Sequence, residues 1–382
     1  MRVALVHELL TMRGGAERVL RVLANMFPDA PIYTLLYDEK KLGDWFPRSR
    51  VRTSSIQPRS EFLGQLFSIF HAQFNHHLYL SRFPAAVEAW DFSDFDLVIS
   101  SSSAFAHGII TNSAPLHLSY IQSPARYLWD RTHDVLERSS RGLLGPLKRA
   151  WLSRIFHRLR IWDTEAADRP DHLIAASKEV QRRIALYWRR ESDIVYPPID
   201  DFWLETRNQS TRNPQPYYLL VSQLASYKRI DLAIHACNAL KAKLIIAGEG
   251  PAKRSLAAIA GPTIEFVGYQ RDDELRTLYA NATATLFPGE EDFGLVPLES
   301  LACGTPVIAY RAGGALETLT GDTAEFFDNS TPQSLIGAME RAKGRTWNAE
   351  ICRTRAQEFS RERFERQLRL AIEAKRSASL HS

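Results

Sequence analysis

The sequence predicts an α/β protein with two domains, each built on a parallel sheet. Short apolar runs alternate with helix-length amphipathic segments along the chain, which is the order of elements in helix-covered parallel sheets. The runs are almost wholly apolar, as expected for strands buried on both faces. The length of 382 residues also suits two domains. We predict strands at residues 3–6, 97–100, 118–121, 173–175, 217–221, 243–247, 264–267, 284–287 and 307–309.

The boundary between the two domains is predicted near residue 200. The paired prolines of Tyr196-Pro197-Pro198-Ile199-Asp200 precede a polar stretch at 206–216, which is typical of a linker. The alternation of strands and helices then restarts at Tyr217. We therefore predict domains at 1–200 and 201–354, followed by a long charged helix from about residue 353.

The composition favours an intracellular globular protein. Apolar residues make up 45% of the chain and charged residues 24%, which is ordinary for such proteins. Cys237, Cys303 and Cys352 lack metal-ligand or redox spacing, so we expect reduced thiols. No secretory signal precedes the first strand, and no run of about 20 apolar residues occurs. We expect a cytoplasmic location.

The most informative loop follows the strand at 284–287. A helix is expected to open near Pro297 and close at Cys303-Gly304. Backbone N–H groups and the helix dipole at such a strand-to-helix loop favour a bound diphosphate. Acids repel phosphate, but Glu299 could accept hydrogen bonds from ribose and Glu291 from sugar hydroxyls. A solvated acidic loop is the alternative.

Three further loops carry residues suited to an anionic ligand. Lys228 lies in the loop after the strand at 217–221, where a cation could neutralise a diphosphate, although a surface lysine is the alternative. Gly14-Gly15 near the first strand and Gly313-Gly314 after the strand at 307–309 permit close approach of a ligand to the backbone.

Taken together, these motifs resemble the retaining glycosyltransferases of family 4, which have the GT-B architecture. The resemblance spans nearly the whole chain and rests on Glu291 and Glu299 with the sequences at 14–19, 247–251, 266–269, 293–295 and 301–309. It implies two Rossmann-like domains with parallel sheets facing across a cleft. The domain at 1–200 would bind the acceptor and that at 201–354 the nucleotide-sugar, with the helix at about 355–382 packed back on the first domain.

The resemblance also assigns roles to individual residues. Glu299 would hold the ribose, Glu291 the donor sugar, and Lys228 the diphosphate. The remaining donor-site residues implied by the family are Gly14, Gly15, Gln223, Arg229, Gly268, Tyr269, Phe293, Gly294 and Leu295. Such enzymes use no metal, so Asp94-Phe95-Asp96 is expected to be a turn. Reaction with retention, in which the leaving diphosphate accepts the acceptor's proton, is likewise implied by the family.

Two positions depart from the family pattern. Gln122 replaces a histidine near the reacting sugar, and Gln223 replaces an arginine that binds the diphosphate. An amide forms hydrogen bonds but supplies no positive charge. Arg229, Arg13 or His107 could compensate. The alternative is a catalytically weak or inactive scaffold that binds nucleotide-sugars.

A basic segment suggests a membrane-bound acceptor. Residues 138–160 contain seven Lys and Arg and no acid. At 146–162, apolar and aromatic residues recur at helical spacing among these charges, as in helices that lie on anionic bilayers. A core-facing helix is the alternative, and no nucleic-acid motif accompanies the charge. The expected acceptor is a glycan or lipid-linked sugar, in bacterial surface polysaccharide synthesis at the inner face of the cytoplasmic membrane. A GDP-mannose or a UDP-sugar donor fits equally well.

Overall fold

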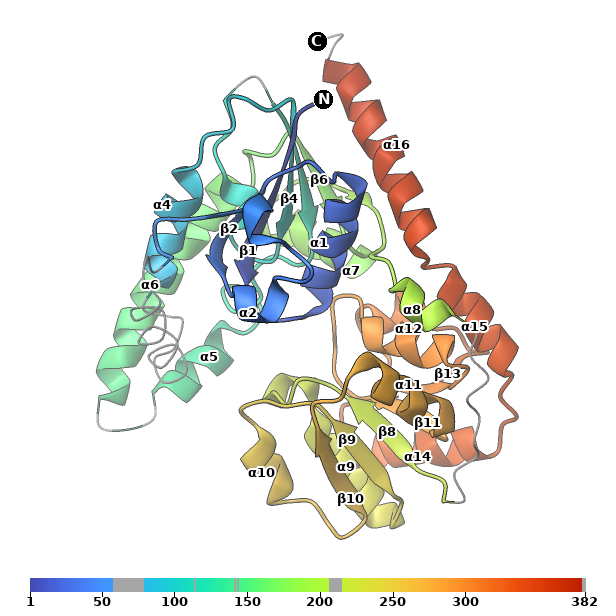
Figure 1. Cartoon of the computed structure of the whole chain (residues 1–382). Helices are drawn as coiled ribbons and strands as arrows, with labels where there is room; N and C mark the ends of the chain where they lie inside the picture. The colour runs from blue at the N-terminus through green and yellow to red at the C-terminus, as the bar shows by residue number, and fades with distance from the viewer. Residues whose placement is uncertain (58–78, 113–114, 141, 143, 206–214, 380–382) are drawn as a thin grey trace. The chain divides into compact units, whose positions relative to one another are not determined.

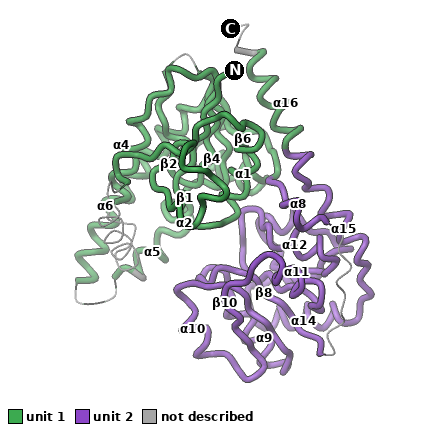
Figure 2. The backbone as a smooth tube through the Cα atoms, in the orientation of Figure 1, with its two compact units in different colours: residues 1–196, 365–382 green, residues 197–364 purple. Residues whose placement is uncertain are grey.

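The chain forms two compact units in the computed structural model, which describes residues 1–57, 79–112, 115–140, 142, 144–205 and 215–379. The N-terminal unit comprises Met1–Tyr196 with Glu365–Ser382, and the C-terminal unit comprises Pro197–Phe364 (Figure 2). The chain therefore divides between Tyr196 and Pro197, inside the paired-proline segment and slightly before the predicted position.

The N-terminal unit is built on a seven-stranded, wholly parallel sheet in the order β3-β2-β1-β4-β5-β6-β7 (Figure 1). Its strands are β1 Val3–Leu10, β2 Ile32–Tyr37, β3 Val51–Thr53, β4 Leu97–Ser102, β5 Leu116–Ile121, β6 His172–Ala175 and β7 Asp193–Ile194. Its helices are α1 Gly15–Met26, α2 Glu39–Leu42, η1 Arg48–Arg50, η3 Leu80–Arg82, α4 Phe83–Glu88, η4 Ala106–Gly108, α5 Thr132–Ser139, α6 Gly145–Ala166 and α7 Lys178–Tyr187.

The core on one face of this sheet is formed by α4 and α6. Ala4 and Val6 on β1 pack in the same buried cluster as Phe83 of α4 and Phe156 of α6. The intervening Leu5 is also fully buried, so β1 is covered on both faces, as its unbroken apolar sequence predicts.

The C-terminal unit has a six-stranded parallel sheet in the order β10-β9-β8-β11-β12-β13. Its strands are β8 Tyr218–Val221, β9 Leu244–Ala247, β10 Ile264–Gly268, β11 Ala284–Phe287, β12 Val307–Tyr310 and β13 Ala324–Phe327. Its helices are α8 Asp201–Leu204, η5 Ser226–Lys228, α9 Ile230–Leu240, α10 Lys253–Ala257, α11 Asp272–Asn281, α12 Leu295–Ala302, α13 Ala315–Thr318, α14 Pro332–Lys343 and α15 Ala349–Gln357. In both sheets the strand order reverses beside the first strand of the unit, and ligands bind at such a switch point, beyond the carboxyl ends of the strands.

The predicted two parallel-sheet, Rossmann-like domains are therefore confirmed, and all nine predicted strands are present. We did not predict β2, β3, β7 and β13 from the sequence. The segment Asp94-Phe95-Asp96 lies in the turn before β4, where an Asp96 carboxylate oxygen accepts the backbone N–H of Arg2 at 2.6 Å.

The single C-terminal helix that we predicted is wrong in detail, because the chain forms two helices there. α15 ends at Gln357, and α16 runs over Arg361–Ser379. From Glu365 onward α16 belongs to the N-terminal unit, with Leu368 and Ile372 buried. None of the helices in the described part of the chain is long and apolar enough to cross a membrane.

Candidate functional site

The loop between β11 and α12 has the predicted strand-to-helix geometry. β11 ends at Phe287, and α12 begins at Leu295, two residues before Pro297. Gly294 caps the helix with φ of 88°, in the left-handed region where a side chain would be strained. The first backbone N–H groups of α12 are unpaired within the helix, so this end attracts an anion.

Glycines bring two neighbouring loops against this one. A Cβ on Gly314 would lie 2.2 Å from the Cα of Phe293, and the Gly314 N–H donates to the Glu291 carbonyl at 2.8 Å. A Cβ on Gly289 would lie 3.0 Å from the Cα of Lys228. The loops after β8, β11 and β12 therefore meet at the carboxyl edge of the sheet, with no room for larger residues at these contacts.

Lys228 and Glu291 form an ion pair with each other. We predicted that Lys228 binds the diphosphate and Glu291 the donor sugar. The Lys228 ammonium contacts Glu291 Oε1, and the two side chains are 16% and 23% exposed. The ammonium also lies 5.2 Å from the centre of the Tyr227 ring. A cation and a carboxylate that are partly exposed and already paired can exchange partners with a ligand carrying both a phosphate and sugar hydroxyls.

Glu299 lies on α12 and is only 9% exposed. Its Oε2 accepts a hydrogen bond of 3.0 Å from the hydroxyl of Tyr279, a fully buried residue of α11. We predicted Glu299 as a site residue from the sequence, but not Tyr279. No spacing motif links the two residues, because their contact is made between two helices.

Gly268 and Tyr269, which the family resemblance places in the donor site, lie at the end of β10. Gly268 has φ of 72°, and a Cβ there would meet Glu249 Oε1 at 2.9 Å. The Tyr269 side chain next to it is 69% exposed. The Gly248 N–H, in the loop after β9, donates to the Gly268 carbonyl at 2.7 Å, so Gly268 lies at the same edge of the sheet as that loop.

Gln223, which replaces the family's diphosphate-binding arginine, and Arg229, a candidate to compensate for it, are differently placed. Gln223 is exposed at the end of β8. The Arg229 guanidinium donates to both oxygens of Asp231 at 3.2 Å and to the Ser330 hydroxyl at 2.6 Å. Arg229 therefore caps α9 with its charge already balanced. Phe293 is buried and packs edge-on against Phe359.

The predicted residues of the N-terminal unit lie at the carboxyl ends of β1 and β5. Gly14 precedes α1, which begins at Gly15, and the Gly14 N–H donates to Glu17 Oε2 at 2.9 Å. The Gln122 amide donates to the Ser101 hydroxyl at 3.2 Å. Arg13, a candidate for charge compensation, is paired with Asp44 at 2.7 Å.

The N-terminal unit also contains a buried network of charged and polar residues that we did not predict from the sequence. One carboxylate oxygen of Glu8 accepts five hydrogen bonds of 2.8–3.0 Å, from the Ser102 hydroxyl and the backbone N–H groups of residues 103–106. Burial by itself raises the pKa of Glu8, but His7 and these N–H groups outweigh it, so the pKa is lowered. Beside it, burial by itself lowers the pKa of His7, but Glu17, Glu8 and the Ser101 carbonyl together outweigh burial, so the pKa of His7 is raised.

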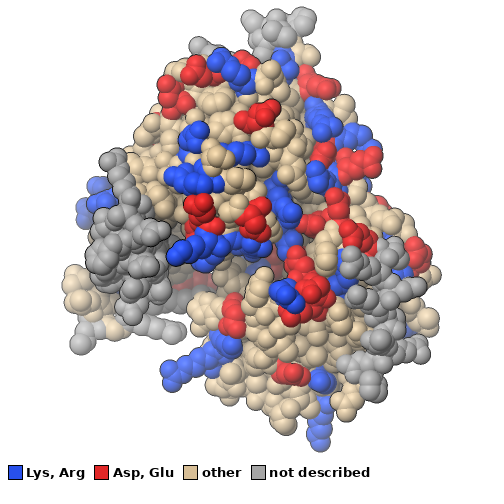
Figure 3. All heavy atoms as spheres, viewed as in Figure 1, with Lys and Arg blue, Asp and Glu red and all other residues tan. Residues whose placement is uncertain are grey.

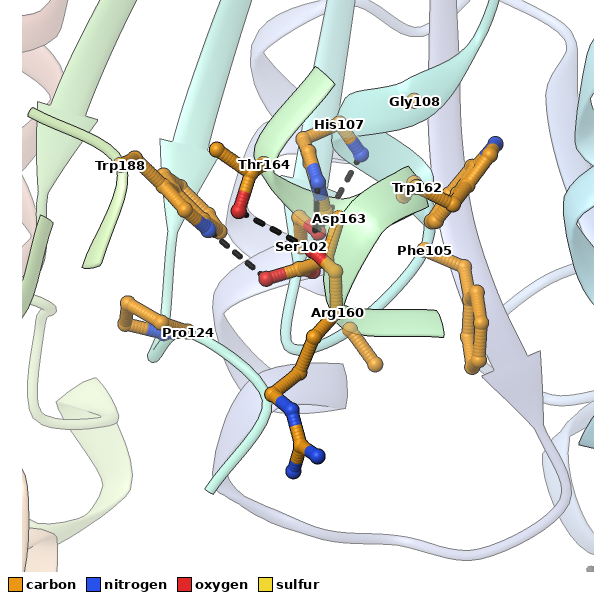
Figure 4. Close-up of polar contacts among 12 residues, drawn as sticks. Ser102, Phe105, His107, Gly108, Pro124, Arg160, Trp162, Asp163, Thr164 and Trp188 are labelled. Carbon is orange, nitrogen blue, oxygen red and sulfur yellow. Dashed lines mark hydrogen bonds and ion pairs between the residues drawn. The ribbon is translucent and has the colours of Figure 1, made fainter. Parts of the chain in front are cut away.

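The network continues to Asp163 on α6 (Figure 4). Asp163 Oδ2 accepts the indole N–H groups of Trp129 at 2.8 Å and Trp188 at 2.7 Å, and Oδ1 lies 3.5 Å from His107 Nε2. Burial raises the pKa of Asp163 and lowers the pKa of His107, and in each case it outweighs the opposing charge of the other group. His107 is fully buried against Asp163 and Ser102, which makes it unsuited to bind a phosphate.

Comparison with protein families identifies the C-terminal unit. Residues 201–359 match the family model described as glycosyl transferases group 1. The match begins near the start of this unit and ends at Phe359, so it includes the loops that hold Lys228, Glu291 and Glu299.

Curated relatives align with only part of the chain. A GDP-mannose-dependent α-(1-6)-phosphatidylinositol dimannoside mannosyltransferase of Mycobacterium tuberculosis is 40% identical over 116 residues, which are 29% of this chain and 30% of that protein. A D-inositol 3-phosphate glycosyltransferase of Acidothermus cellulolyticus is 33% identical over 157 residues, 35% of each chain. The chain thus matches about a third of the length of these relatives.

Solved structures share the fold of the whole chain. HepE of Anabaena in complex with UDP has a TM-score of 0.68 and 15% identity, covering 98% of this chain and 100% of that one. WaaG, a glycosyltransferase involved in lipopolysaccharide biosynthesis, has a TM-score of 0.59 and 15% identity, covering 95% of each chain. These similarities show the GT-B fold.

Proposed function

We propose that this chain is a glycosyltransferase of family 4 that moves a hexose from a nucleotide-sugar to a glycan or lipid-linked acceptor. The observation that carries the proposal is the Lys228–Glu291 pair, which joins the loop before α12 to the loop after β8, together with Glu299 on α12 itself. They lie in the segment that matches the group 1 family. The relatives that align with part of the chain include glycosyltransferases by name.

The donor would exchange the ion partners in this site. A diphosphate at the N-terminal end of α12 is stabilised by the backbone N–H groups and displaces Glu291 as the counter-ion of Lys228. Glu291 then accepts hydrogen bonds from the hydroxyls of the donor sugar. Glu299 accepts those of the ribose, and the backbone near Gly268 and Tyr269 contacts the base.

Transfer would proceed with retention and without a metal ion. The bond from the anomeric carbon to the diphosphate breaks, and the acceptor oxygen bonds to that carbon on the same face. The leaving diphosphate oxygen takes the acceptor's proton. Lys228 and the dipole of α12 stabilise the negative charge that develops on the diphosphate.

The donor is either GDP-mannose or a UDP-sugar. The Mycobacterium tuberculosis relative is GDP-mannose-dependent by name, whereas the Anabaena structures contain UDP or UDP-glucose. A thermal-shift screen of nucleotide-sugars would decide, because a ligand that binds only the folded state raises the melting temperature. No shift with any nucleotide-sugar would contradict the proposal.

The second candidate function is a binding scaffold without transferase activity. The exposed amide of Gln223 and the balanced charge of Arg229 favour it, because neither supplies a second cation for the diphosphate. A transferase incubated with its donor releases nucleoside diphosphate, at least slowly to water. A scaffold binds the donor and leaves it intact. Measuring the released nucleoside diphosphate therefore distinguishes a transferase from a scaffold.

Helix α6 supports peripheral binding to the cytoplasmic face of the membrane, as expected for an enzyme of bacterial surface polysaccharide synthesis. Leu152, Phe156 and Leu159 pack in the core, as in the alternative interpretation of this segment. Its N-terminal turns reach beyond the sheet (Figure 1) and expose Leu147 and Trp151. The same helix carries four exposed basic residues: Lys148, Arg149, Arg154 and Arg158.

This end of α6 combines the features of a helix that docks on an anionic bilayer. Apolar side chains can enter the headgroup region while the basic ones contact lipid phosphates. On the face shown in Figure 3, by comparison, Lys and Arg lie among Asp and Glu. The proposed membrane contact therefore depends on the local cluster on α6 and not on the net charge of +4.

A further inference from the structure

Glu299 is held by a residue that no sequence motif includes. Tyr279 on α11 is fully buried and donates its hydroxyl to Glu299 Oε2 at 3.0 Å. The tyrosine is itself fixed on two sides. Its backbone carbonyl accepts the Thr305 hydroxyl at 2.6 Å, and its ring packs edge-on against Trp203 with the centroids 5.7 Å apart.

A buried guanidinium lies in the same region. Arg276, one helical turn before Tyr279 on α11, is 5% exposed and lies 3.7 Å above the ring of Phe202. Burial raises the pKa of the Cys303 thiol to about 12, with the charge of Glu299 adding to this effect and the charge of Arg276 opposing it. Both charges are thus within electrostatic range of one thiol.

A buried carboxylate is stable only where hydrogen bonds and opposite charge offset its lost hydration. Tyr279 supplies a hydrogen bond to Glu299, and the buried Arg276 lies one helical turn before Tyr279 on α11. A carboxylate can accept about four hydrogen bonds, so the bond from Tyr279 is compatible with donors from a ligand. The same bond restricts the rotation of the carboxylate, because the rigid tyrosine ring fixes the position of its hydroxyl.

From this geometry we infer that Tyr279 is a positioning residue, which orients Glu299 for the vicinal hydroxyls of a ribose. The preference of the site for ribonucleotides over deoxyribonucleotides then depends on Tyr279. This inference rests on the proposed function, in which Glu299 contacts the ribose. It concerns a residue that does not itself touch the nucleotide.

The test compares nucleotides with and without the ribose hydroxyls. Dissociation constants of UDP and GDP, and of their 2′-deoxy and 3′-deoxy forms, are measured by calorimetry on the full-length protein. A deoxynucleotide lacks one of the hydroxyls that would bind Glu299. In the wild type we therefore expect it to bind roughly 10- to 100-fold more weakly than the ribonucleotide. In Tyr279→Phe we expect the ribonucleotide to bind roughly 10-fold more weakly, while the deoxy forms change less than 3-fold.

Tyr217→Phe is a matched control for the loss of a buried hydroxyl. Tyr217 is 2% exposed and donates its hydroxyl to the Leu278 carbonyl at 2.8 Å, on the same helix α11. This variant should lose similar stability and keep the wild-type ratio of ribo to deoxy affinities. Glu299→Ala gives the ratio that remains when the carboxylate is absent.

The outcomes separate the inference from the function on which it rests. A wild type that binds none of these nucleotides overturns the proposed function. A wild type that prefers ribonucleotides, with a Tyr279→Phe variant that keeps the full preference, overturns the inference alone. If that variant does not fold, 3-fluorotyrosine at position 279 keeps the ring and changes the acidity of the hydroxyl. A ratio that shifts more than 2-fold then supports the inference, and an unchanged ratio counts against it.

Discussion

Lys228 and Glu291 balance each other's charge from two different loops at the carboxyl edge of the C-terminal sheet. Neither loop is positioned by the ion pair alone, because Gly289 allows the backbones of the two loops to approach closely. The pair is partly exposed, so its contribution to stability is small, as for other exposed ion pairs. Its position at the N-terminal end of α12 indicates a role in binding instead.

Replacing Lys228 by Gln should therefore impair transfer much more than folding. Removing a cation that stabilises the leaving diphosphate should lower kcat by roughly 100- to 1000-fold, about 3–4 kcal/mol. The melting temperature should change little. The control is Lys253→Gln, which breaks the exposed pair of Lys253 with Glu249. Equal kcat for the two variants, measured as release of nucleoside diphosphate, would contradict the role given to Lys228.

The contact between Gly314 and Phe293 should tolerate no side chain. In Gly314→Ala the new Cβ would fall 2.2 Å from the Cα of Phe293, so one loop must move away from the other. We expect a loss of roughly 1–3 kcal/mol of stability and a large rise in the donor KM. Gly321→Ala is the control, because a Cβ there has no neighbour within 4 Å. Urea unfolding and donor titration of both variants would check this, and wild-type behaviour of Gly314→Ala would refute the close contact.

Acid should destabilise the N-terminal unit through His117. Burial lowers the pKa of His117 from 6.5 to about 3, and its Nε2 lies 2.8 Å from the Ser100 hydroxyl. The unfolded chain therefore binds a proton between these two pH values while the folded chain does not. The contribution of His117 should lower the free energy of unfolding by about 1.4 kcal/mol for each pH unit between 6.5 and about 3.

The measurement is the free energy of unfolding against pH for the wild type and for His117→Gln, which can keep the bond to Ser100. The variant should lose this slope between pH 6.5 and about 3. His235→Gln changes an exposed histidine and should leave the slope unchanged. Parallel curves for the wild type and His117→Gln would contradict the prediction.

Glu8 adds to acid sensitivity in a lower range. Its pKa is lowered in the fold, so its stabilising effect is present above its ordinary value of 4.5 and is lost as pH falls through the lowered value. In contrast to His117, it should contribute no slope between pH 5 and 7.

Binding to anionic membranes should depend on the exposed end of α6. Replacing Lys148, Arg149, Arg154 and Arg158 by Ser removes four charges, each worth about 1 kcal/mol near an anionic surface. We expect at least 100-fold weaker binding to vesicles with anionic lipid, measured by sedimentation. A control variant replaces the exposed basic residues Lys40, Arg52, Arg189 and Arg254 by Ser. If both variants bind equally, α6 is not the contact.

The strands and the donor loop could be predicted from sequence because they depend on local patterns. Nine strands are short, nearly continuous apolar runs, and a strand followed by glycine, acids and a helix is readable residue by residue. Among the missed strands, β2 is also a nearly continuous apolar run that we did not recognise, whereas β3, β7 and β13 lack such a pattern. β7 has only two residues, and β13 includes Glu325, whose carboxylate is paired with Arg341 and Arg345. The break between α15 and α16 falls in a stretch of mostly helix-favouring residues, so composition alone did not indicate it.

The buried network could not be predicted for a different reason. Charged residues are usually exposed, so nothing in the sequence indicated that Glu8 and Asp163 are buried. Their burial depends on partners distant in the chain: residues 102–106 for Glu8, and Trp129 and Trp188 for Asp163. Tyr279 was missed likewise, because its bond to Glu299 links two helices. Local sequence patterns do not show contacts of this kind.

The most direct test of the proposed function is release of nucleoside diphosphate from a panel of UDP- and GDP-sugars, followed with wild-type protein and with Glu291→Ala. We expect the wild type to release the diphosphate from at least one of these donors. We expect Glu291→Ala to bind that donor more weakly and to release nucleoside diphosphate from it at least 100-fold more slowly. If no donor is bound or cleaved by the wild type, or if the variant cleaves its donor as fast, the loop between β11 and α12 is not a sugar-donor site.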